Sequence, residues 1–546
     1  MAVSRTFWRS RTVAVAVAAT LVLILAVPAV AAPGGFLTAA PRYVLPSALG
    51  VSTTAILTVG DAVPEADAST DATDPGGLPQ DGVYRMVGVP DGLGAFRNYG
   101  NDEDGGGGGT FTVLMNHELG PTFGVARDHG STGAFVSRWV LRTSDFSVIS
   151  GDDQIKTVYL AAAGGGWTGP GTFAFDRFCS ADLPASTALY DAGSGLGTQE
   201  LLYLNGEEAR PPFGTRYGKA FAHIVTGPAN GQTYELNDLG EMSFENVVAS
   251  PLAQTKTVVV GLDDSTNRFT GGTPAADANN PPSEVYVYVG DKSDEGNPVE
   301  RAGLVGGDLF GVRVSGRLNE DVIVDGDRFA LQSMSEAAQD DGVVLQAESI
   351  AEGVTQFRRA EDGHWDPTSP NDFYFVTTDQ FAGVTSVWRL RFDDVSDPEL
   401  GGRIDRVYRA SPGHTEAGAA TEPEPQPGEM FDNMTVDAEG RILLQEDPGN
   451  TPHLARIWAL NPDNGRIGEL AIHNPALFLT APVITLDEES SGIVDISHIV
   501  GRTTYLIDVQ AHVRLADPEL FEDGQFLAMT VKWQKMLDQS GARVFP

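Results

Sequence analysis

The sequence predicts an all-β fold on three observations. Short runs rich in β-branched and aromatic residues recur along the chain, each bounded by Gly, Pro, Asp or Asn. Helical periodicity is scarce, and residues 334–339 and 530–537 are the best helix candidates. The polar insertions between the runs have the same β-pattern on both sides, so we expect surface loops and not domain boundaries.

The clearest predicted strands are spread over most of the chain. Strands this short and numerous exceed what a sandwich normally uses, and radial repetition of four-stranded sheets accommodates them. We therefore predict a β-propeller with long loop insertions, although no fixed repeat of 40–50 residues is visible. The predicted strands are 111–116, 200–205, 256–261, 284–289, 372–378, 386–392, 441–445 and 503–509.

Three regions follow from this pattern. Residues 1–31 carry Arg5, Arg9 and Arg11 without an acid, then an apolar run and a small-residue site, which predicts a signal peptide. A retained membrane anchor is the alternative, but the run is short for a span. Residues 32–82 are expected to pack partly on the propeller and to contain an acidic loop, and residues 83–546 are the predicted propeller domain.

Charge limits the partners of the protein. The 36 Lys+Arg and 74 Asp+Glu give a formal net charge of −38, which becomes −41 once the three arginines of the signal are removed. Such a charge argues against binding to nucleic acid and suits an extracellular, cation-rich setting. We expect a secreted monomer with no stable membrane insertion after cleavage of the signal.

Carboxylates, in most cases paired, close several predicted strands. They occur in NHE (116–118), GEE (206–208), EDG (361–363) and QED (445–447). Carboxylates gathered at strand ends repel one another and lose hydration, so a folded protein usually places a cation between them. Because the inner strands of a propeller line one channel, acids from distant blades would converge there. The pattern predicts a multi-metal site in the channel.

Cys179 is the only cysteine of the chain. It has no partner for an intramolecular disulfide, and an unpaired thiol in an exported protein is either buried or a ligand. From this residue alone, a small buried hydrophobe and a metal-binding thiolate are both open.

Several segments together resemble a known family. They are FTVLMNHELG, DHGSTGAFVSRW, CSADLP followed by GLGT and GEE, LGEMSFENVV leading to GLDDST and EVYVYVG, FRRAEDGHWDPTSPNDFYFVTTD, and FDNMTVDAEGRILLQEDPGN. In this order they resemble the secreted PhoX-type alkaline phosphatases, over roughly residues 36–512. The resemblance implies a six-bladed propeller, hydrolysis of phosphate monoesters, and a central cluster of Ca²⁺ and Fe³⁺ held by one cysteine thiolate and carboxylates.

The resemblance also implies roles for individual residues. Cys179 matches the iron-bridging cysteine, Glu245 and Glu361 match the iron-binding glutamates, and Arg359 matches the phosphate-binding arginine. These four are the predicted catalytic residues. Arg359 and Glu361 are two positions apart, so on a strand both would point into the channel. The candidate calcium ligands are Glu118, Glu207, Glu208, Asp362, Asp432 and Asp447.

This sequence departs from the family at several points. Phe244 stands where the family has a histidine, Ala360 where it has a proline, and Leu196 where it has a tryptophan, and no twin arginine precedes the apolar run. The first two differences bear on the predicted iron pair more than on the fold.

Simpler interpretations also stand beside the family roles. Glu245 and Glu361 could be solvated turn carboxylates, and Arg359 could form an ion pair with Glu361 while Arg358 binds the substrate. The pairs 263–264 and 393–394 are most simply acidic loops, so we leave them out of the predicted site.

Three functions are compatible with the sequence. The leading hypothesis is a phosphatase that acts on a small phosphorylated substrate with calcium and iron. The alternatives are a non-catalytic calcium-binding propeller that binds a surface partner, and a phytase-like or phosphodiester hydrolase on the same scaffold.

Overall fold

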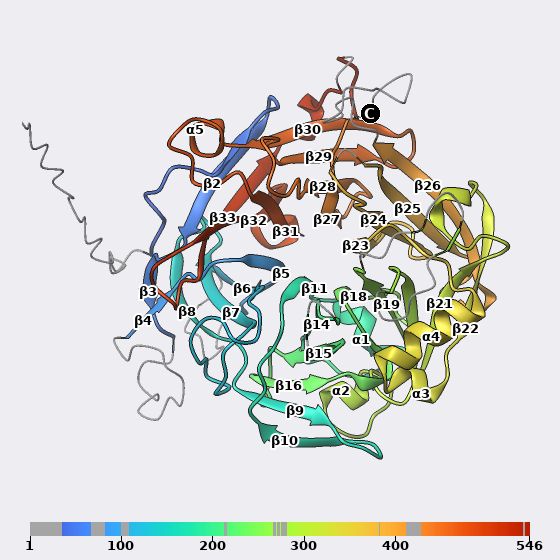
Figure 1. Ribbon diagram of the computed structural model, residues 1–546. Helices are drawn as coiled ribbons and strands as arrows, with labels where there is room; N and C mark the ends of the chain where they lie inside the picture. The colour runs from blue at the N-terminus through green and yellow to red at the C-terminus, as the bar shows by residue number, and fades with distance from the viewer. Residues whose placement is uncertain are drawn as a thin grey trace, which may run out of the picture.

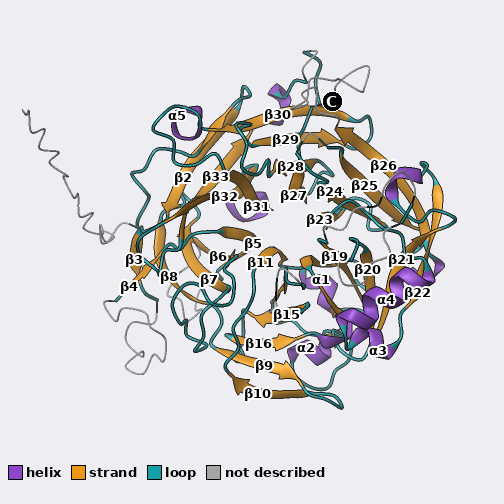
Figure 2. Ribbon diagram, viewed as in Figure 1, coloured by secondary structure: helices purple, strands orange, loops and turns teal. Residues whose placement is uncertain are grey.

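The computed structural model describes residues 35–66, 82–99 and 109–545, apart from 212–213, 215, 266–268, 270–272, 275–280, 382, 411–426 and 539–540. In this part of the chain nearly all regular structure is β, and the sheets are arranged around a central axis (Figure 1, Figure 2). The fold is an all-β propeller with long loop insertions, as the sequence predicts. The predicted signal peptide and most of the acidic loop lie outside the described residues.

Six blades can be followed among the described residues, each with an inner strand named first. The first blade is β5 (Pro90–Arg97), β6 (Thr110–His117), β7 (Phe135–Arg142) and β8 (Val148–Asp153), and the second is β11 (Phe178–Asp182), β14 (Leu202–Glu207), β15 (Gly218–Ile224) and β16 (Gln232–Glu235). The third is β18 (Phe244–Ala249), β19 (Lys256–Asp263), β20 (Val285–Asp291) and β21 (Asp308–Val314), and the fourth is β23 (Ala360–Trp365), β24 (Asp372–Thr377), β25 (Thr385–Phe392) and β26 (Gly402–Ala410). The fifth is β27 (Phe431–Val436), β28 (Ile442–Glu446), β29 (Arg456–Asn461) and β30 (Arg466–His473), and the sixth is β31 (Glu488–Asp495), β32 (Thr504–Arg514), β33 (Glu522–Val531) and β2 (Val51–Thr58).

Further strands extend these blades. β9 (Thr157–Ala161) and β10 (Trp167–Gly171) continue the second blade, with β17 (Glu241–Met242) paired to β15. β22 (Asp327–Ser333) pairs with both β21 and β26, so the third and fourth blades share one sheet. The remaining strands are β1 (Val44–Pro46), β3 (Ala62–Pro64), β4 (Val83–Arg85), β12 (Tyr190–Asp191) and β13 (Leu196–Gly197).

The six inner strands form a closed ring. β5 contacts β11, and the contacts continue through β18, β23, β27 and β31 back to β5. Figure 1 shows these strands surrounding the centre of the molecule. Residues that lie at equivalent places on the inner strands therefore meet on one axis, although they are far apart in sequence.

The ring is closed by a strand from near the beginning of the described chain. β2 pairs antiparallel with β33, from Val51 opposite Val531 to Thr58 opposite Gln525. β1 adds to the neighbouring blade by pairing with β30. The 32–82 segment thus supplies outer strands to two blades, which joins the two ends of the propeller by backbone hydrogen bonds.

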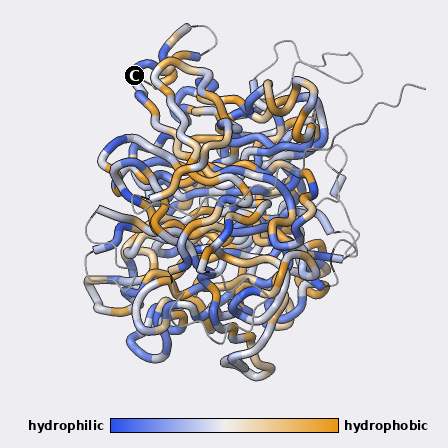
Figure 3. Tube along the Cα trace, turned by 90° about the vertical axis from the view of Figure 1, so that its left-hand side faces the viewer, coloured by the Kyte–Doolittle hydropathy of each residue, from blue (hydrophilic) through white to orange (hydrophobic). Residues whose placement is uncertain are grey.

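An apolar cluster fills the space between each pair of neighbouring blades. Strand β19 shows why its sequence is a continuous run of valines. Val258 and Val260 point toward the fourth blade, whereas Val259 points toward the second. Because both faces of a blade are covered, both sets of alternating side chains are apolar. Figure 3 shows the molecule from the side, with apolar and polar residues interleaved along the chain.

Each of the eight predicted strands overlaps a strand of the structure, but one helix prediction is wrong. Residues 530–531 end β33, and Trp533–Lys535 form a single 3₁₀ turn that packs Trp533 against Tyr505. The longest described helix, α4 (Gly342–Glu352), lies on the outside of the propeller beside α3 (Glu336–Gln339). The other helices are α1 (Ser186–Leu189), α2 (Pro298–Arg301), α5 (Pro475–Phe478) and α6 (Ser497–Val500). None of the described helices has the length and apolar character of a membrane span.

Candidate metal centre

The same position in every inner strand carries an acid or the cysteine. The second residue of each inner strand points to the start of the channel, and we call this set the inner ring. It consists of Asp91, Cys179, Glu245, Glu361, Asp432 and Glu489. Five carboxylates and one thiol from six blades are thus placed at equivalent points around one axis.

A β-bulge accompanies the inner ring. In five of the inner strands the pairing register shifts between the first strand residue and the third or fourth, so the inner-ring residue is left out of the ladder. In β31 the shift comes just after Glu489, between Ser490 and Ile493. A bulge re-aims side chains and ends regular pairing, which is why bulges are frequent beside functional sites.

A second set of residues surrounds the inner ring. In each blade, a backbone N–H at the end of the second strand donates to the carbonyl oxygen two residues before the inner-ring residue, over 2.8–3.1 Å. The donor directly follows the strand in five blades and lies near the end of β32 in the sixth. One hydrogen bond repeated in six blades makes these positions equivalent, and we call them the outer ring. The donors and acceptors are Glu118 to Val89, Glu208 to Arg177, Asp264 to Ser243, Thr378 to Arg359, Asp447 to Met430, and His512 to Asp487.

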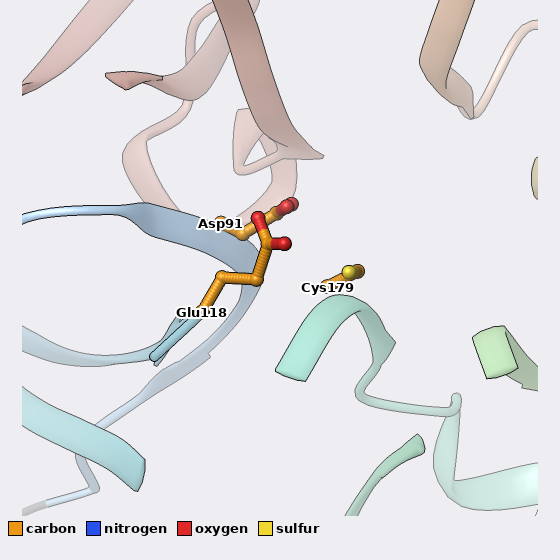
Figure 4. A group of neighbouring side chains, drawn as sticks. All are labelled: Asp91, Glu118 and Cys179. Carbon is orange, nitrogen blue, oxygen red and sulfur yellow. The ribbon is translucent and has the colours of Figure 1, made fainter. Parts of the chain in front are cut away.

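Two groups of three side chains are close enough to share a cation. Asp91, Glu118 and Cys179 bring an oxygen or sulfur atom each within 4.8 Å of the others. Figure 4 shows the Asp91 and Glu118 carboxylates side by side with the Cys179 sulfur beyond them. Glu245, Glu361 and Asp432, from three successive blades, form the other group. Oxygen ligands suit calcium, and a thiolate favours a softer metal such as iron.

The two rings concentrate negative charge. They hold nine carboxylates and one thiol, whereas the cations that act on them among the described residues are Arg177, Arg359 and His512. Burial raises the pKa of Asp91, Glu245 and Asp432 well above the usual carboxyl range, and neighbouring carboxylates raise it further. Groups with such shifts must either take up protons or bind cations.

Asp508 provides a second sign that cations fit here. Its carboxylate is fully buried, and neither oxygen accepts a hydrogen bond from the described residues. Burial raises the pKa of Asp508 well above its ordinary value, and Glu489 raises it further. Asp508 in turn raises the pKa of Asp91. A buried carboxylate with two unused oxygens is costly unless it is protonated or coordinates a cation.

Cys179 is buried among acids. Its Sγ atom lies 3.6 Å from Oε2 of Glu208. Burial raises the pKa of the Cys179 thiol, and Glu118 and Glu245 raise it further. These surroundings favour the protonated thiol, and a cation bound beside Cys179 would favour the thiolate.

Arg359 lies at the edge of the inner ring on a left-handed residue, with φ of 60°. Its Nη2 atom is 2.8 Å from Oε1 of Glu361 and 2.8 Å from Oδ2 of Asp264. Arg358, in contrast, pairs with Asp321 at 2.8 Å and with Asp379 at 3.7 Å, and neither acid belongs to the rings. Of the two neighbouring arginines, Arg359 is the one that pairs with ring acids.

The channel continues beyond the inner ring into a cavity of about 1240 Å³. Residues further along the inner strands line it, including Leu93, Val248 and Val436. The two rings thus lie at the end of the channel where the inner strands begin.

Among solved structures, the chain is similar to Pseudomonas fluorescens PhoX in complex with vanadate, a transition-state analogue. The match covers 93% of this chain and 98% of that chain, with a TM-score of 0.57 and 12% sequence identity. The fold is PhoX-like. At this identity the likeness concerns the fold alone. Comparison with protein-family models gives no match, and comparison with curated proteins gives none either.

Two further solved structures have lower TM-scores than PhoX. A putative 6-phosphogluconolactonase from Bacteroides uniformis has a TM-score of 0.28 at 12% identity, covering 76% of this chain and 98% of that chain. An aldose sugar dehydrogenase from Escherichia coli has a TM-score of 0.27 at 8% identity, covering 77% of this chain and 100% of that chain. TM-scores this low support no conclusion about the site.

The PhoX-like fold brings most of the predicted site residues together. The predicted residues that belong to the two rings or contact them are Cys179, Glu245, Glu361, Asp432, Glu118, Glu208, Asp447 and Arg359. Asp91, Glu489, Asp264, His512 and Asp508 were missed. Asp91 and Glu489 are each the second residue of an inner strand, β5 or β31, that was not among the strands predicted from the sequence.

Glu207 and Asp362 are the two predicted calcium ligands that belong to neither ring. Glu207 forms an ion pair with Arg216 and accepts hydrogen bonds from the N–H groups of Asp176 and Lys219. Asp362 accepts hydrogen bonds from Asn246 at 2.6 Å and from the N–H of Met434 at 2.9 Å. Glu207 directly precedes Glu208, and Asp362 directly follows Glu361. Because neighbouring residues on a strand point to opposite faces, neither side chain points the same way as the adjacent ring residue.

Proposed function

We propose that this protein is an exported, metal-dependent phosphatase that hydrolyses small phosphate monoesters at the two rings. The observation that carries the proposal is the inner ring itself, in which six blades of a PhoX-like fold each contribute one ligand-type side chain at the same position. Arg359 beside this ring supplies a guanidinium suited to a phosphate oxygen pair.

The candidate metal-binding side chains fall into two chemical classes. Carboxylates of both rings would hold calcium. Iron would be held by Cys179, which is grouped with Asp91 and Glu118, and by Glu245 and Glu361 of the other group. When bound, such cations neutralise phosphoryl oxygens and lower the pKa of coordinated water. Phe244 replaces the histidine of the PhoX-type pattern, and its side chain is buried in the apolar cluster between the second and third blades. Iron would therefore have to be held without that histidine.

The residues of the chain have separable tasks. Arg359 would bind and orient the phosphoryl group, and Asp264 would hold the guanidinium in place through two hydrogen bonds of 2.8 and 2.9 Å. The excess of carboxylates would repel a phosphate dianion unless cations were present, so activity should depend strictly on metal.

One experiment separates the candidate functions. The purified protein, loaded with calcium and iron, would be analysed for metal content and assayed with p-nitrophenyl phosphate, bis-p-nitrophenyl phosphate and phytate. Calcium with hydrolysis of the monoester supports the proposal. Calcium without any turnover would favour a binding protein, and preference for the diester or for phytate would reassign the substrate.

A further inference from the structure

A second arginine occupies the place in the second blade that Arg359 occupies in the fourth. Both residues lie two positions before an inner-ring residue, and the carbonyl oxygen of each accepts the hydrogen bond that defines the outer ring. The distances are 2.9 Å from Glu208 to Arg177 and 3.1 Å from Thr378 to Arg359. The two arginines are therefore structural equivalents.

Arginine at this position is not required by the fold. The six equivalent residues are Val89, Arg177, Ser243, Arg359, Met430 and Asp487. Four of them, Val89, Arg177, Arg359 and Met430, have a positive φ, between 39° and 60°. The left-handed conformation is thus common at the position two residues before the inner-ring residue, and it occurs with apolar side chains as well as basic ones. The two arginines add positive charge at two of these six positions.

Both arginines act on the same stretch of the outer ring. Arg177 lies beside Glu208, with Nη1 3.2 Å from Oε2, and Arg359 lies beside Asp264 of the next blade. Glu208 forms a β-bridge with Ser243, and the carbonyl oxygen of Ser243 accepts a hydrogen bond from the N–H of Asp264. The acids that Arg177 and Arg359 contact are therefore neighbours in the outer ring.

Acids hold Arg177 less closely than they hold Arg359. Arg359 donates two hydrogen bonds to Asp264 and also pairs with Glu361 at 2.8 Å. Arg177 donates a hydrogen bond from Nη2 to the carbonyl oxygen of Glu208, and its ion pairs are longer, 3.2 Å to Glu208 and 3.8 Å to Asp176. The side chain of Arg177 is also the more exposed, at 29% against 22%. An oxyanion that enters from solvent can therefore compete with these acids for the N–H donors of Arg177.

We propose that Arg177 is a second phosphate-binding arginine that, together with Arg359, holds the phosphoryl group of the substrate and the phosphate product. The inference rests on the proposed function and deepens it, because it names a substrate-binding residue in the same site. Two guanidinium groups from different blades can contact different oxygens of one phosphate, which fixes its orientation better than one.

Inorganic phosphate is the probe that tests this inference. Its affinity for the calcium- and iron-loaded protein would be measured by calorimetry, and its inhibition constant and the KM for p-nitrophenyl phosphate by kinetics. Arg177→Gln should weaken phosphate binding and raise KM by about 10- to 100-fold, since a hydrogen bond to a charged group is lost. Arg177→Lys should recover part of the affinity, because it keeps the charge but not the planar fork.

Two controls make the result specific. Arg358→Gln removes an arginine next to Arg359 that pairs with Asp321, so phosphate affinity should be unchanged. Metal content and Tm would be measured for every variant. Unchanged phosphate affinity in Arg177→Gln, or weaker affinity accompanied by loss of calcium, would overturn the inference, because Arg177 would then serve only to hold Glu208.

The outcome does not depend on turnover. If the native protein binds phosphate but hydrolyses no ester, the proposed function fails while calorimetry still tests Arg177. If hydrolysis is present and Arg177→Gln behaves as the native protein does, only the inference about Arg177 fails.

Discussion

The guanidinium of Arg359 donates hydrogen bonds to both carboxylate oxygens of Asp264, from Nε to Oδ1 over 2.9 Å and from Nη2 to Oδ2 over 2.8 Å. Asp264 is buried, with 3% of its side chain exposed, and it comes from a different blade than Arg359. A planar, two-point contact of this kind fixes both the position and the rotation of the guanidinium. Asp264 is thus a positioning residue for the predicted phosphate-binding arginine.

Replacing Asp264 tests this role. Asp264→Asn keeps the shape of the side chain but removes the charge-assisted contact, so we expect kcat/KM for p-nitrophenyl phosphate to fall by about 10-fold or more. Steady-state kinetics at saturating calcium would measure it. Asp393→Asn is the matched control, since Asp393 pairs with Arg328 at the surface, where such pairs contribute only about 0–1 kcal/mol. Equal kinetics for both variants would remove Asp264 from the site.

The thiol of Cys179 is expected to decide which metal binds. Cys179→Ala should retain calcium, which needs only oxygen ligands, and should lose iron together with any visible absorption that iron gives. Elemental analysis and absorption spectra of the loaded protein would measure both. A variant that holds as much iron as the native protein would show that Cys179 is a buried hydrophobe.

Calcium should stabilise the protein more at alkaline than at acidic pH. Burial raises the pKa of Glu208 and Glu489 from an ordinary value of 4.5 to about 7. The pKa of each group is higher in the folded protein than in the unfolded chain, so the protonated carboxyl groups stabilise the fold. In the metal-free protein this stabilisation is complete below pH 4.5 and is lost as pH rises through 7. Bound calcium favours the ionised carboxylates and therefore opposes this loss of stability at higher pH.

Thermal unfolding with and without calcium measures this effect. The calcium-induced rise in Tm should be larger at about pH 8 than at about pH 5, and Glu489→Gln should reduce the difference. A calcium effect of the same size at both pH values would contradict the assignment of these buried carboxylates to a cation site.

Gly92 follows Asp91 at the closest approach of the first two inner strands. A Cβ atom on Gly92 would lie 2.5 Å from the nitrogen of Ala181 and 2.7 Å from the carbonyl oxygen of Cys179. Gly92→Ala should therefore push β5 away from β11, separate Asp91 from Cys179 and reduce both metal content and activity. Gly171→Ala is the control, because its Cβ would meet nothing within 4 Å. Native metal content in Gly92→Ala would contradict this account.

The strands were predictable because their composition reflects burial on both faces. The valine run of β19 is an example, since alternate residues enter two different apolar clusters. The 530–537 helix was predicted wrongly because Trp533 and Met536 have helical spacing, yet both are buried against the last two blades. Helix α4 was missed although Asp341 caps its start and Gly353 ends it in a left-handed conformation.

The candidate site was predictable only where a motif marked it. Glu245 and Glu361 were found from the segments around them, whereas Asp91 and Asp264 look like ordinary loop acids in the sequence. Their importance comes from equivalence between blades, which is set by backbone pairing and bulges that no short segment reveals. Glu207 and Glu208 were both chosen, because the sequence does not say which of two adjacent acids faces the channel.

The pairing of β2 with β33 also governs when the propeller can first close. During synthesis Asp91 and Glu118 leave the ribosome long before Glu489 and His512, and β2 must wait for its partner strand to appear. Until then the last blade is missing and no ion can be enclosed by all six. Maturation therefore begins only after translation of the final strands, and a chain released early would expose an unpaired edge and uncompensated acids together.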